Sequence, residues 1–366
     1  MSTVKTETQN KTKIFKMSTK ILKDEPLKPY ESSSIIKHEK LFEKKLDTNH
    51  NEKSIAQMQY KMQIVWFNAI GFLIFHLAGL YGIFLLFTNA KLLTGFWTIA
   101  LGYISALATT MGAHRLYTHR TFKANKWIRG TLVLFQTVAG QNCLWVWIRD
   151  HRQHHKYSDT DADPHNSSRG FFFSHIGWLM VKKHPDVIKK GKMIDMSDID
   201  RDPIVMFQKK YYKRLFIIFS IILPVIIPCY LWNETLFNSF FLSFVGRLVI
   251  SLNFTWLVNS AAHIYGTRPF SKDIAPAENW FVSFMGLGEG WHNYHHTFPW
   301  DYRAAEFGQY FNVTTTVIDF CARRGWVYDI KSASPELVQK YATKKGDGSH
   351  PVYGKLNPED LWVHDY

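Results

Sequence analysis

The sequence predicts an all-α integral membrane protein in which four transmembrane helices form two hairpins and a cytosolic helical domain caps them. Three observations favour this fold class: four uninterrupted apolar stretches, a composition that is 46% hydrophobic and 16% aromatic, and histidines gathered beside the apolar stretches. So much aromatic surface excludes a disordered or fibrous chain. The 366 residues are therefore predicted to form mainly one large membrane domain.

The chain before the first apolar stretch, residues 1–63, carries 13 Lys against 8 acidic residues and lacks apolar periodicity. We predict a basic, mostly disordered cytosolic tail there, without a cleaved signal peptide. Three widely separated cysteines support neither a disulfide framework nor a thiolate metal site. The net charge of +14 suits an anionic membrane surface, an anionic ligand or an acidic partner.

The four apolar stretches each approach the ~20 residues that a membrane-spanning helix needs. They are residues 64–88, 92–112, 215–232 and 239–259. A fifth candidate, residues 131–148, contains Gln136, Gln141 and Asn142 and is expected to lie at the membrane interface or on the domain. Four spans return the chain to its starting side.

The distribution of basic residues predicts the orientation. Only Lys91 lies in a turn within a hairpin and only Arg247 within a span, so the other 42 Lys and Arg share the face that bears both termini. Positive charge favours the cytosolic side, which places both termini there. The cytosolic segments of the domain are then residues 113–214 and 260–330, and residues 331–366 form a cytosolic C-terminal tail.

Nine of the 17 histidines fall into four clusters, each beside the cytosolic end of a predicted span or in a cytosolic segment. They are His114 and His119; His151, His154 and His155; His263; and His292, His295 and His296. In each HxxHH motif, positions i, i+3 and i+4 share one helix face. His114 and His119 would stand about 140° apart on an α-helix, so we expect that helix to end or bend there. Asn259 precedes His263 by one turn.

These ten side chains exceed the first shell of one ion, about four to six ligands, so the clusters predict two metal ions. Imidazole ligands suit Fe, Zn, Cu or Ni and do not by themselves name the metal. A fifth span would place the first two clusters in opposite compartments, which again favours four spans. A metal transporter is a rival hypothesis, but it predicts ionisable residues along a path inside the spans, where only His76 and Arg247 lie. The other eight histidines are predicted to be ordinary core or surface residues, with His350 at the surface.

Four motifs carry a resemblance to a known family. HRLYTHRTFKA, WIRDHRQHHKYSDTDADPH, NSAAHIYG and GEGWHNYHHTFPWDY, in this order around two hydrophobic hairpins, resemble the membrane acyl-CoA desaturases of the stearoyl-CoA type, particularly insect forms. The resemblance covers residues 60–330 and implies two irons. One would be held by His114, His119, His151, His155 and His295, and the other by His154, His263, His292 and His296, with Asn259 near the second through water.

The resemblance also implies the reaction. A cis double bond enters a saturated long-chain fatty acyl-CoA, with O2 as co-substrate and two electrons from cytochrome b5 and its NADH-dependent reductase, in the endoplasmic reticulum membrane. Carbon 9 is favoured over carbon 11, and no nucleic acid takes part. A di-iron membrane hydroxylase is the alternative, since it uses similar histidine clusters.

Seven residues match positions that contact the acyl-CoA in the family: Asn68, Asn142, Arg149, Asp150, Lys182, Lys183 and Trp256. The resemblance also implies that the methyl end of the acyl chain stops against the second span, where the matching stretch runs from Gly102 to Ala106. Each has a structural alternative: Lys182 and Lys183 as lipid anchors, Arg149 and Asp150 as a helix-surface pair, and the others as packing residues. Lys182 stands where relatives often have Arg, which removes the bidentate geometry for phosphate.

Overall fold

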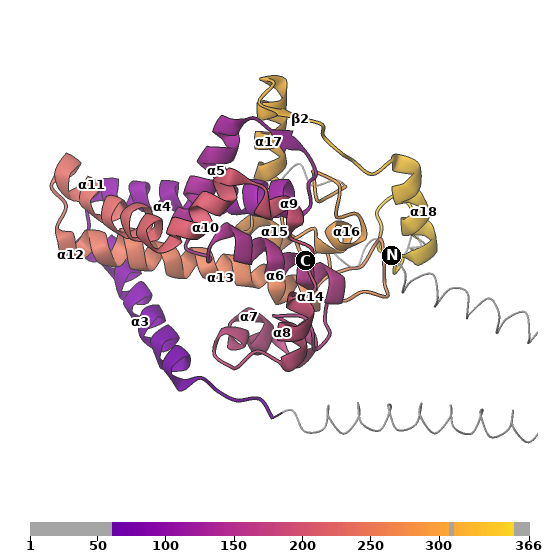
Figure 1. Cartoon of the computed structure of the whole chain (residues 1–366), viewed down its shortest axis with the longest axis horizontal. Coiled ribbons are helices and arrows are strands. Elements are labelled where there is room, and N and C mark those ends of the chain that lie inside the picture. Colours follow the sequence, from indigo (N-terminus) through magenta and orange to yellow (C-terminus); the bar gives the residue numbers. More distant parts are fainter. Residues whose placement is uncertain (1–60, 307–310, 355–366) are drawn as a thin grey trace, which may run out of the picture. The chain divides into compact units, whose positions relative to one another are not determined.

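The computed structural model describes residues 61–306 and 311–354 (Figure 1). Every described helix and strand lies within residues 62–354. The predicted N-terminal tail lies outside the described residues except for its last three.

Four helices are long and apolar enough to cross a membrane, in agreement with the number predicted from the sequence. They are α3 (Trp66–Thr88); α4 (Leu92–Leu107) continued by η1 (Ala108–Thr118); α10 (Pro203–Phe216) continued by η4 (Ile217–Ile222) and α11 (Leu223–Trp232); and α12 (Leu236–Ser239) continued by η5 (Phe240–Gly246), α13 (Arg247–Asn259) and α14 (Ala261–Ile264). Helix α4 packs against α11 and α13, and α3 packs against η5 and α13.

The third long helix begins earlier than the predicted span at residue 215. Asp202 caps it by accepting hydrogen bonds from the backbone N–H groups of Ile204 and Val205. The basic side chains that follow do not interrupt the helix, because Lys and Arg have good helix propensity. Hydropathy located the apolar part of this helix and missed its basic first half.

Close packing of α3 on η5 and α13 depends on glycine. A Cβ on Gly82 would lie 2.1 Å from the carbonyl oxygen of Phe241, and one on Gly79 would lie 2.6 Å from a methyl group of Val249. Small residues at such crossings let helix backbones approach in an apolar environment. Segments η1, η4 and η5 are π-helical, so three of the four long helices contain a wider turn with i→i+5 hydrogen bonds.

The segment between the hairpins consists of short helices and one short strand. Its elements are β1 (Lys123–Ala124), α5 (Lys126–Ala139), α6 (Leu144–Tyr157), the 3₁₀ turn η2 (Ser167–Arg169), α7 (Phe171–His175), the 3₁₀ turn η3 (Gly177–Leu179), α8 (Pro185–Gly191) and α9 (Ser197–Asp200). The fifth apolar candidate is divided between α5 and α6 by Gly140 and Asn142, whose φ angles of 68° and 73° end the helix. It is not among the spans of the described chain.

The last segment, which follows α14, packs against the helix of the first histidine cluster through α17 (Val313–Arg323) and η1. It also contains α15 (Trp280–Met285), α16 (His292–Thr297), β2 (Val327–Tyr328) and α18 (Pro335–Lys345). Strand β2 pairs antiparallel with β1, with Tyr328 opposite Lys123 and Val327 opposite Ala124. A core of residues from η1, α5, α6 and α17 lies beside this pair.

Residues 331–354 are folded, although the sequence assigned them to a C-terminal tail. Ala333, Val338 and Ala342 pack on Phe270, Tyr294 and Phe298, all buried. The predicted surface residue His350 is 1% exposed and lies 2.6 Å from a carboxylate oxygen of Glu306. Hydropathy missed this segment because its apolar residues are few and their partners are distant in sequence.

Candidate metal centre

Nine histidines converge into two groups, and they are the nine clustered histidines of the sequence. The first group is His114, His119, His151, His155 and His295, and the second is His154, His263, His292 and His296. Within each group the candidate ligand atoms lie within 4.8 Å of one another. The division is the one that the resemblance implied. The segments η1, α6, α14 and α16 supply them, together with the residue after η1.

The first cluster depends on the π-helical form of η1. The backbone N–H of His119 donates to the carbonyl of His114 over 3.2 Å, a bond between residues five apart. This wider turn brings the two rings to a centroid distance of 4.9 Å. The helix ends there, as expected: its last segment is π-helical and His119 is the C-cap residue.

Ring nitrogens crowd together in the first group. Nε2 of His295 lies 2.9 Å from Nε2 of His114 and 3.0 Å from Nε2 of His155. Nε2 of His151 lies 3.1 Å from that of His119. Five nitrogens with lone pairs directed at one region repel one another unless a cation lies between them, so the arrangement fits a metal site.

The second group has the same character. Nε2 of His292 lies 3.1 Å from Nε2 of His263 and 3.2 Å from Nε2 of His296. Nε2 of His154 is buried without a hydrogen-bond partner. Because buried polar atoms are nearly always paired, this nitrogen fits a metal ligand.

Three carboxylates, which the sequence analysis did not single out, lie behind the histidines. Asp163 is 2.8 Å from Nδ1 of His154, Asp159 is 3.0 Å from Nδ1 of His263, and Glu289 is 2.8 Å from Nδ1 of His114. A carboxylate at Nδ1 fixes the tautomer that leaves Nε2 as the ligand atom. Asp159 and Asp163 lie in the motif DTDADPH and Glu289 lies in GEGWH. Their closeness in sequence to the histidine clusters is the signal that could have identified them.

Electrostatics keeps most of these histidines neutral. Burial, reinforced by the neighbouring histidines, holds the pKa of six of them well below the usual 6.5: His119, His151, His155, His292, His295 and His296. Burial by itself would also lower the pKa of His154, but Asp163 more than offsets it and raises that pKa. Burial would raise the pKa of Asp163, yet His154 lowers it to about 2. Neutral imidazole is the form that binds a metal.

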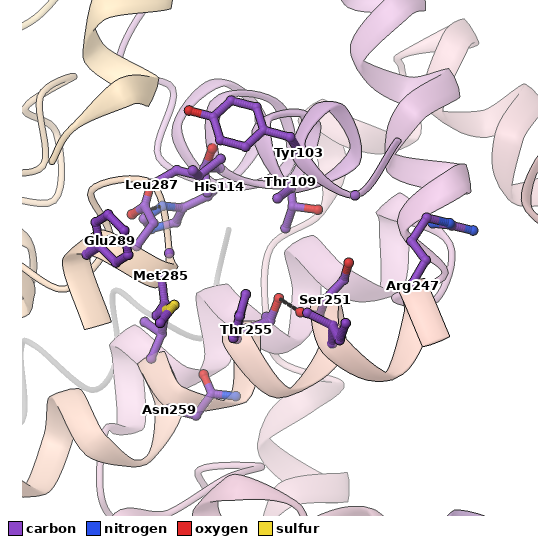
Figure 2. A pocket seen from close by; sticks show the side chains of 18 of the residues that line it. Tyr103, Thr109, His114, Arg247, Ser251, Thr255, Asn259, Met285, Leu287 and Glu289 are labelled. Carbon is purple, nitrogen blue, oxygen red and sulfur yellow. Dashed lines mark hydrogen bonds and ion pairs between the residues drawn. The ribbon is translucent and has the colours of Figure 1, made fainter. Parts of the chain in front are cut away.

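A cavity of about 360 Å³ extends from the histidines along α4 and α13 (Figure 2). His114 and His151 from the first group and His292 from the second line it. Asn259 lines it too, as do the predicted substrate residues Gly102 and Ala106. The cavity thus joins both candidate metal groups to the space between two spans.

The cavity walls are apolar despite their hydroxyl groups. Thr98, Thr109 and Thr255 each donate to a carbonyl one turn earlier in their own helix. Their hydroxyl protons are therefore satisfied by the backbone and their methyl groups remain to face a ligand. Such a space suits an extended apolar chain.

Four predicted substrate residues lie together around α6 and η3. A second cavity, of about 410 Å³, is lined by Arg149, Asp150 and Lys183. Arg149 pairs with Asp150 over 2.6 Å, and Lys183 lies 3.5 Å from the same carboxylate. Lys182 precedes Lys183, and its backbone N–H donates to the carbonyl of Gln63.

The remaining three occupy separate positions. The side chain of Asn68 donates to the carbonyl of Leu179 over 2.9 Å and so ties α3 to η3. Asn142 is exposed in the turn between α5 and α6. Trp256 is 4% exposed and stacks on His76, with ring centroids 6.2 Å apart, and it does not line the cavity near the histidines.

Comparisons with known proteins agree with this site. The sequence profile of the fatty acid desaturase family matches residues 89–332. The chain is 53% identical to the acyl-CoA Δ9 desaturase of Acheta domesticus over 84% of this chain and 86% of the relative. It is 49% identical to the acyl-CoA Δ12-desaturase of the same organism, over 81% and 83%, and 51% identical to the acyl-CoA Δ11 desaturase of Trichoplusia ni, over 82% and 86%. The profile covers two thirds of this chain, and the relatives match more than four fifths of it. This chain therefore belongs to the fatty acid desaturase family.

Proposed function

We propose that the protein is an acyl-CoA desaturase that inserts a cis double bond into a saturated long-chain fatty acyl-CoA. One observation carries the proposal: the apolar cavity between α4 and α13 ends at histidines of both candidate metal groups. An acyl chain in this cavity would have its methylene groups beside the metals. The desaturase relatives are similar over more than four fifths of this chain, which supports the same conclusion.

Two iron ions are the proposed cofactor, held by the two histidine groups. Neutral imidazoles with buried Nε2 atoms fit iron, and the family relationship favours it over zinc or copper. When bound, the irons would supply the chemistry that no side-chain acid or base can perform, namely the use of O2 to remove hydrogen from unactivated methylenes. Asn259, at the end of α13 and on the cavity wall, is proposed to assist the second group through water.

The chain itself supplies positioning and exclusion of water. The walls described above hold an alkyl chain without offering it a hydrogen bond, and Gly102 and Ala106 leave room on the α4 side. An extended chain fixed at both ends presents one pair of carbons to the histidines. We propose that this geometry determines which bond is oxidised.

The second cavity is the proposed site of the CoA headgroup. Arg149 and Lys183 line it, Lys182 is adjacent in sequence, and cations of this kind bind phosphate groups. Asn68, near the start of α3, and Asn142, between α5 and α6, are proposed to act as polar contacts. Trp256, which packs on His76 and lines neither cavity, is proposed to be a packing residue.

The electron donor and the location rest on the resemblance and on charge. We propose cytochrome b5, with its NADH-dependent reductase, because the net charge of +14 suits an acidic protein partner. Four candidate spans and the concentration of basic residues on one face support a multi-pass protein of the endoplasmic reticulum with both termini in the cytosol.

Carbon 9 is the proposed position of the double bond. The relatives at 49–53% identity carry names that specify Δ9, Δ11 and Δ12, so overall identity does not discriminate among positions. The Δ9 relative has the highest identity of these three, and the resemblance to the stearoyl-CoA type favours the same carbon.

Expression in a desaturase-deficient yeast tests the proposal, with double-bond positions mapped by mass spectrometry. The His263→Ala variant, expressed to the same level, serves as the inactive control. A Δ9 alkene supports the full proposal, and an alkene at another carbon contradicts only the position. An alcohol as the product would instead identify a hydroxylase. If well-expressed protein with its electron donor forms no product, both the desaturase and the hydroxylase hypotheses are contradicted.

A further inference from the structure

Arg247 is a buried cation inside a predicted membrane span. It begins α13 and is 1% exposed. Among the described residues no carboxylate pairs with it. Its guanidinium instead donates to backbone carbonyls: Nε to Ser243 over 2.9 Å, Nη1 to Val138 over 2.8 Å and Nη2 to Ser220 over 3.1 Å. An ionisable residue within a span is costly and usually has a function.

The three carbonyls belong to three different elements. Ser243 lies in the π-helical segment η5 and Ser220 in the π-helical segment η4, where the regular α-helical ladder is interrupted. Val138 lies in the last turn of α5, where carbonyls lack an intrahelical donor. The guanidinium therefore holds Arg247 through a planar, rigid set of donors, a geometry that the rotatable ammonium of Lys does not have.

The side chain of Arg247 also belongs to the cavity wall. A Cβ on Gly102, in α4, would lie 3.8 Å from Cγ of Arg247, so the stem of Arg247 reaches α4 at Gly102, and both residues line the cavity. Thr98, one turn before Gly102, bonds to the hydroxyl of Ser243 over 2.9 Å on the same side. In Figure 2 Arg247 lies far from His114, and its guanidinium points away from the other labelled residues.

Arg247 stands at the end of the cavity that is remote from the metals. It is the first lining residue of α13 and Asn259 is the last, a separation of about 18 Å along the helix axis. The corresponding lining residues of α4 and η1 run from Thr98 to His114 in the same order.

We propose that Arg247 is a specificity-determining residue: its aliphatic stem forms the end wall of the acyl cavity and sets the longest chain accepted. This inference rests on the proposed function. The anchored guanidinium keeps the stem in place, so the end wall is rigid. The double bond stays at a constant distance from the carboxyl end, because the metal groups and the second cavity are unaffected.

The test measures kcat/KM for 16-, 18- and 20-carbon acyl-CoA with the reconstituted full-length enzyme. Arg247→Ala should raise the ratio of the 20-carbon to the 16-carbon substrate at least about tenfold, since each additional buried methylene contributes about fourfold. Arg247→Met, which keeps an unbranched stem but loses the anchor, should shift the ratio less. Leu248→Ala is the matched control, because Leu248 is a buried neighbour that does not line the cavity.

An unchanged ratio in folded Arg247→Ala, or an equal shift in Leu248→Ala, would overturn the inference. If Arg247→Ala does not fold, the wild-type enzyme still provides a test through a 16- or 18-carbon acyl-CoA with a photoreactive diazirine at its terminal carbon. Crosslinks should fall on residues 98–102 or 247–251, and crosslinks elsewhere would refute the end-wall role. Failure of the proposed function is distinguishable, because the wild-type enzyme would then form no alkene from any chain length.

Discussion

Nδ1 of His154 lies 2.8 Å from a carboxylate oxygen of Asp163, and both side chains are almost fully buried. Asp163 also accepts a hydrogen bond from the backbone N–H of Asp159, whose own carboxylate contacts His263. Two of the four histidines in the second group are thus held by carboxylates that are linked to each other. This connection makes the region between α6 and η2 part of the metal centre.

Asp163→Asn should weaken metal binding about 10- to 100-fold, because the amide keeps the shape but loses the charge that orients His154. Metal content per protein after dialysis against graded chelator measures this loss. Asp161→Asn is the control: Asp161 belongs to the same loop but pairs with Arg169 at the surface. Equal metal retention in Asp163→Asn and wild type would show that the carboxylate is dispensable.

Removal of a proposed ligand should have a larger effect. His154→Ala or His296→Ala is expected to abolish desaturation and to lower bound iron from two per chain, because no neighbouring side chain replaces the lost nitrogen. His350→Ala serves as a control with a buried histidine outside both groups. It should reduce thermal stability and keep its metal. Full activity with two irons in either ligand variant would contradict the assignment.

The double variant Lys182→Ala, Lys183→Ala should raise KM for acyl-CoA about fivefold and change kcat less, since exposed charge pairs contribute up to about 1 kcal/mol. Steady-state kinetics at saturating electron donor separates the two constants. The charge-matched control is Lys123→Ala, Lys126→Ala, because neither lysine lines the second cavity. If KM does not change, the two lysines are membrane anchors.

Ala106→Leu should shift the preference toward shorter acyl chains, because the larger side chain enters the cavity from the α4 side. Gly102→Phe should act in the same direction, since a Cβ at Gly102 already reaches contact distance from Arg247 and Ser251. Product analysis with 14-, 16- and 18-carbon acyl-CoA measures the shift. The double bond should remain at the same carbon, and an unchanged length profile in folded protein would refute these wall positions.

Glu278 should make stability depend on pH. Burial of its carboxyl raises the pKa from 4.5 to about 8, although the residue as a whole is half-buried. Between these values the folded protein holds a proton that the unfolded chain releases, so the contribution of Glu278 to stability declines as pH rises through this window. Glu278→Gln keeps an acceptor for the backbone N–H of Tyr294 and has no proton to lose.

The difference in Tm between Glu278→Gln and wild type should therefore grow in favour of the variant from about pH 5 to about pH 8 and level off above. Melting curves in detergent at several pH values give this difference. Glu336→Gln, at an exposed position in α18, should show no such growth. A constant difference for Glu278→Gln would mean that this carboxyl ionises normally in the folded protein.

The helical periodicity of the HxxHH motifs was sufficient to predict which histidines act together within each motif. His151, His154 and His155 face one side of α6 because i, i+3 and i+4 are neighbours on any α-helix. Run length and hydropathy likewise located four spans, because a membrane imposes a minimum apolar length. The implied division of the nine histidines into two groups came from the resemblance to a known family, and the structure has the same two groups.

Tertiary structure decided what depends on contacts between distant residues. The sequence predicted that the helix ends or bends near His114 and His119, and it does end at Thr118; the π-helical form of this last segment, which brings both rings into one group, was not predicted. The pairing of Arg247 with carbonyls of three elements, and the packing of residues 331–354 on α16, join segments far apart in the chain. Spacing and hydropathy are local properties of the chain, and such contacts form only when the long helices have packed together.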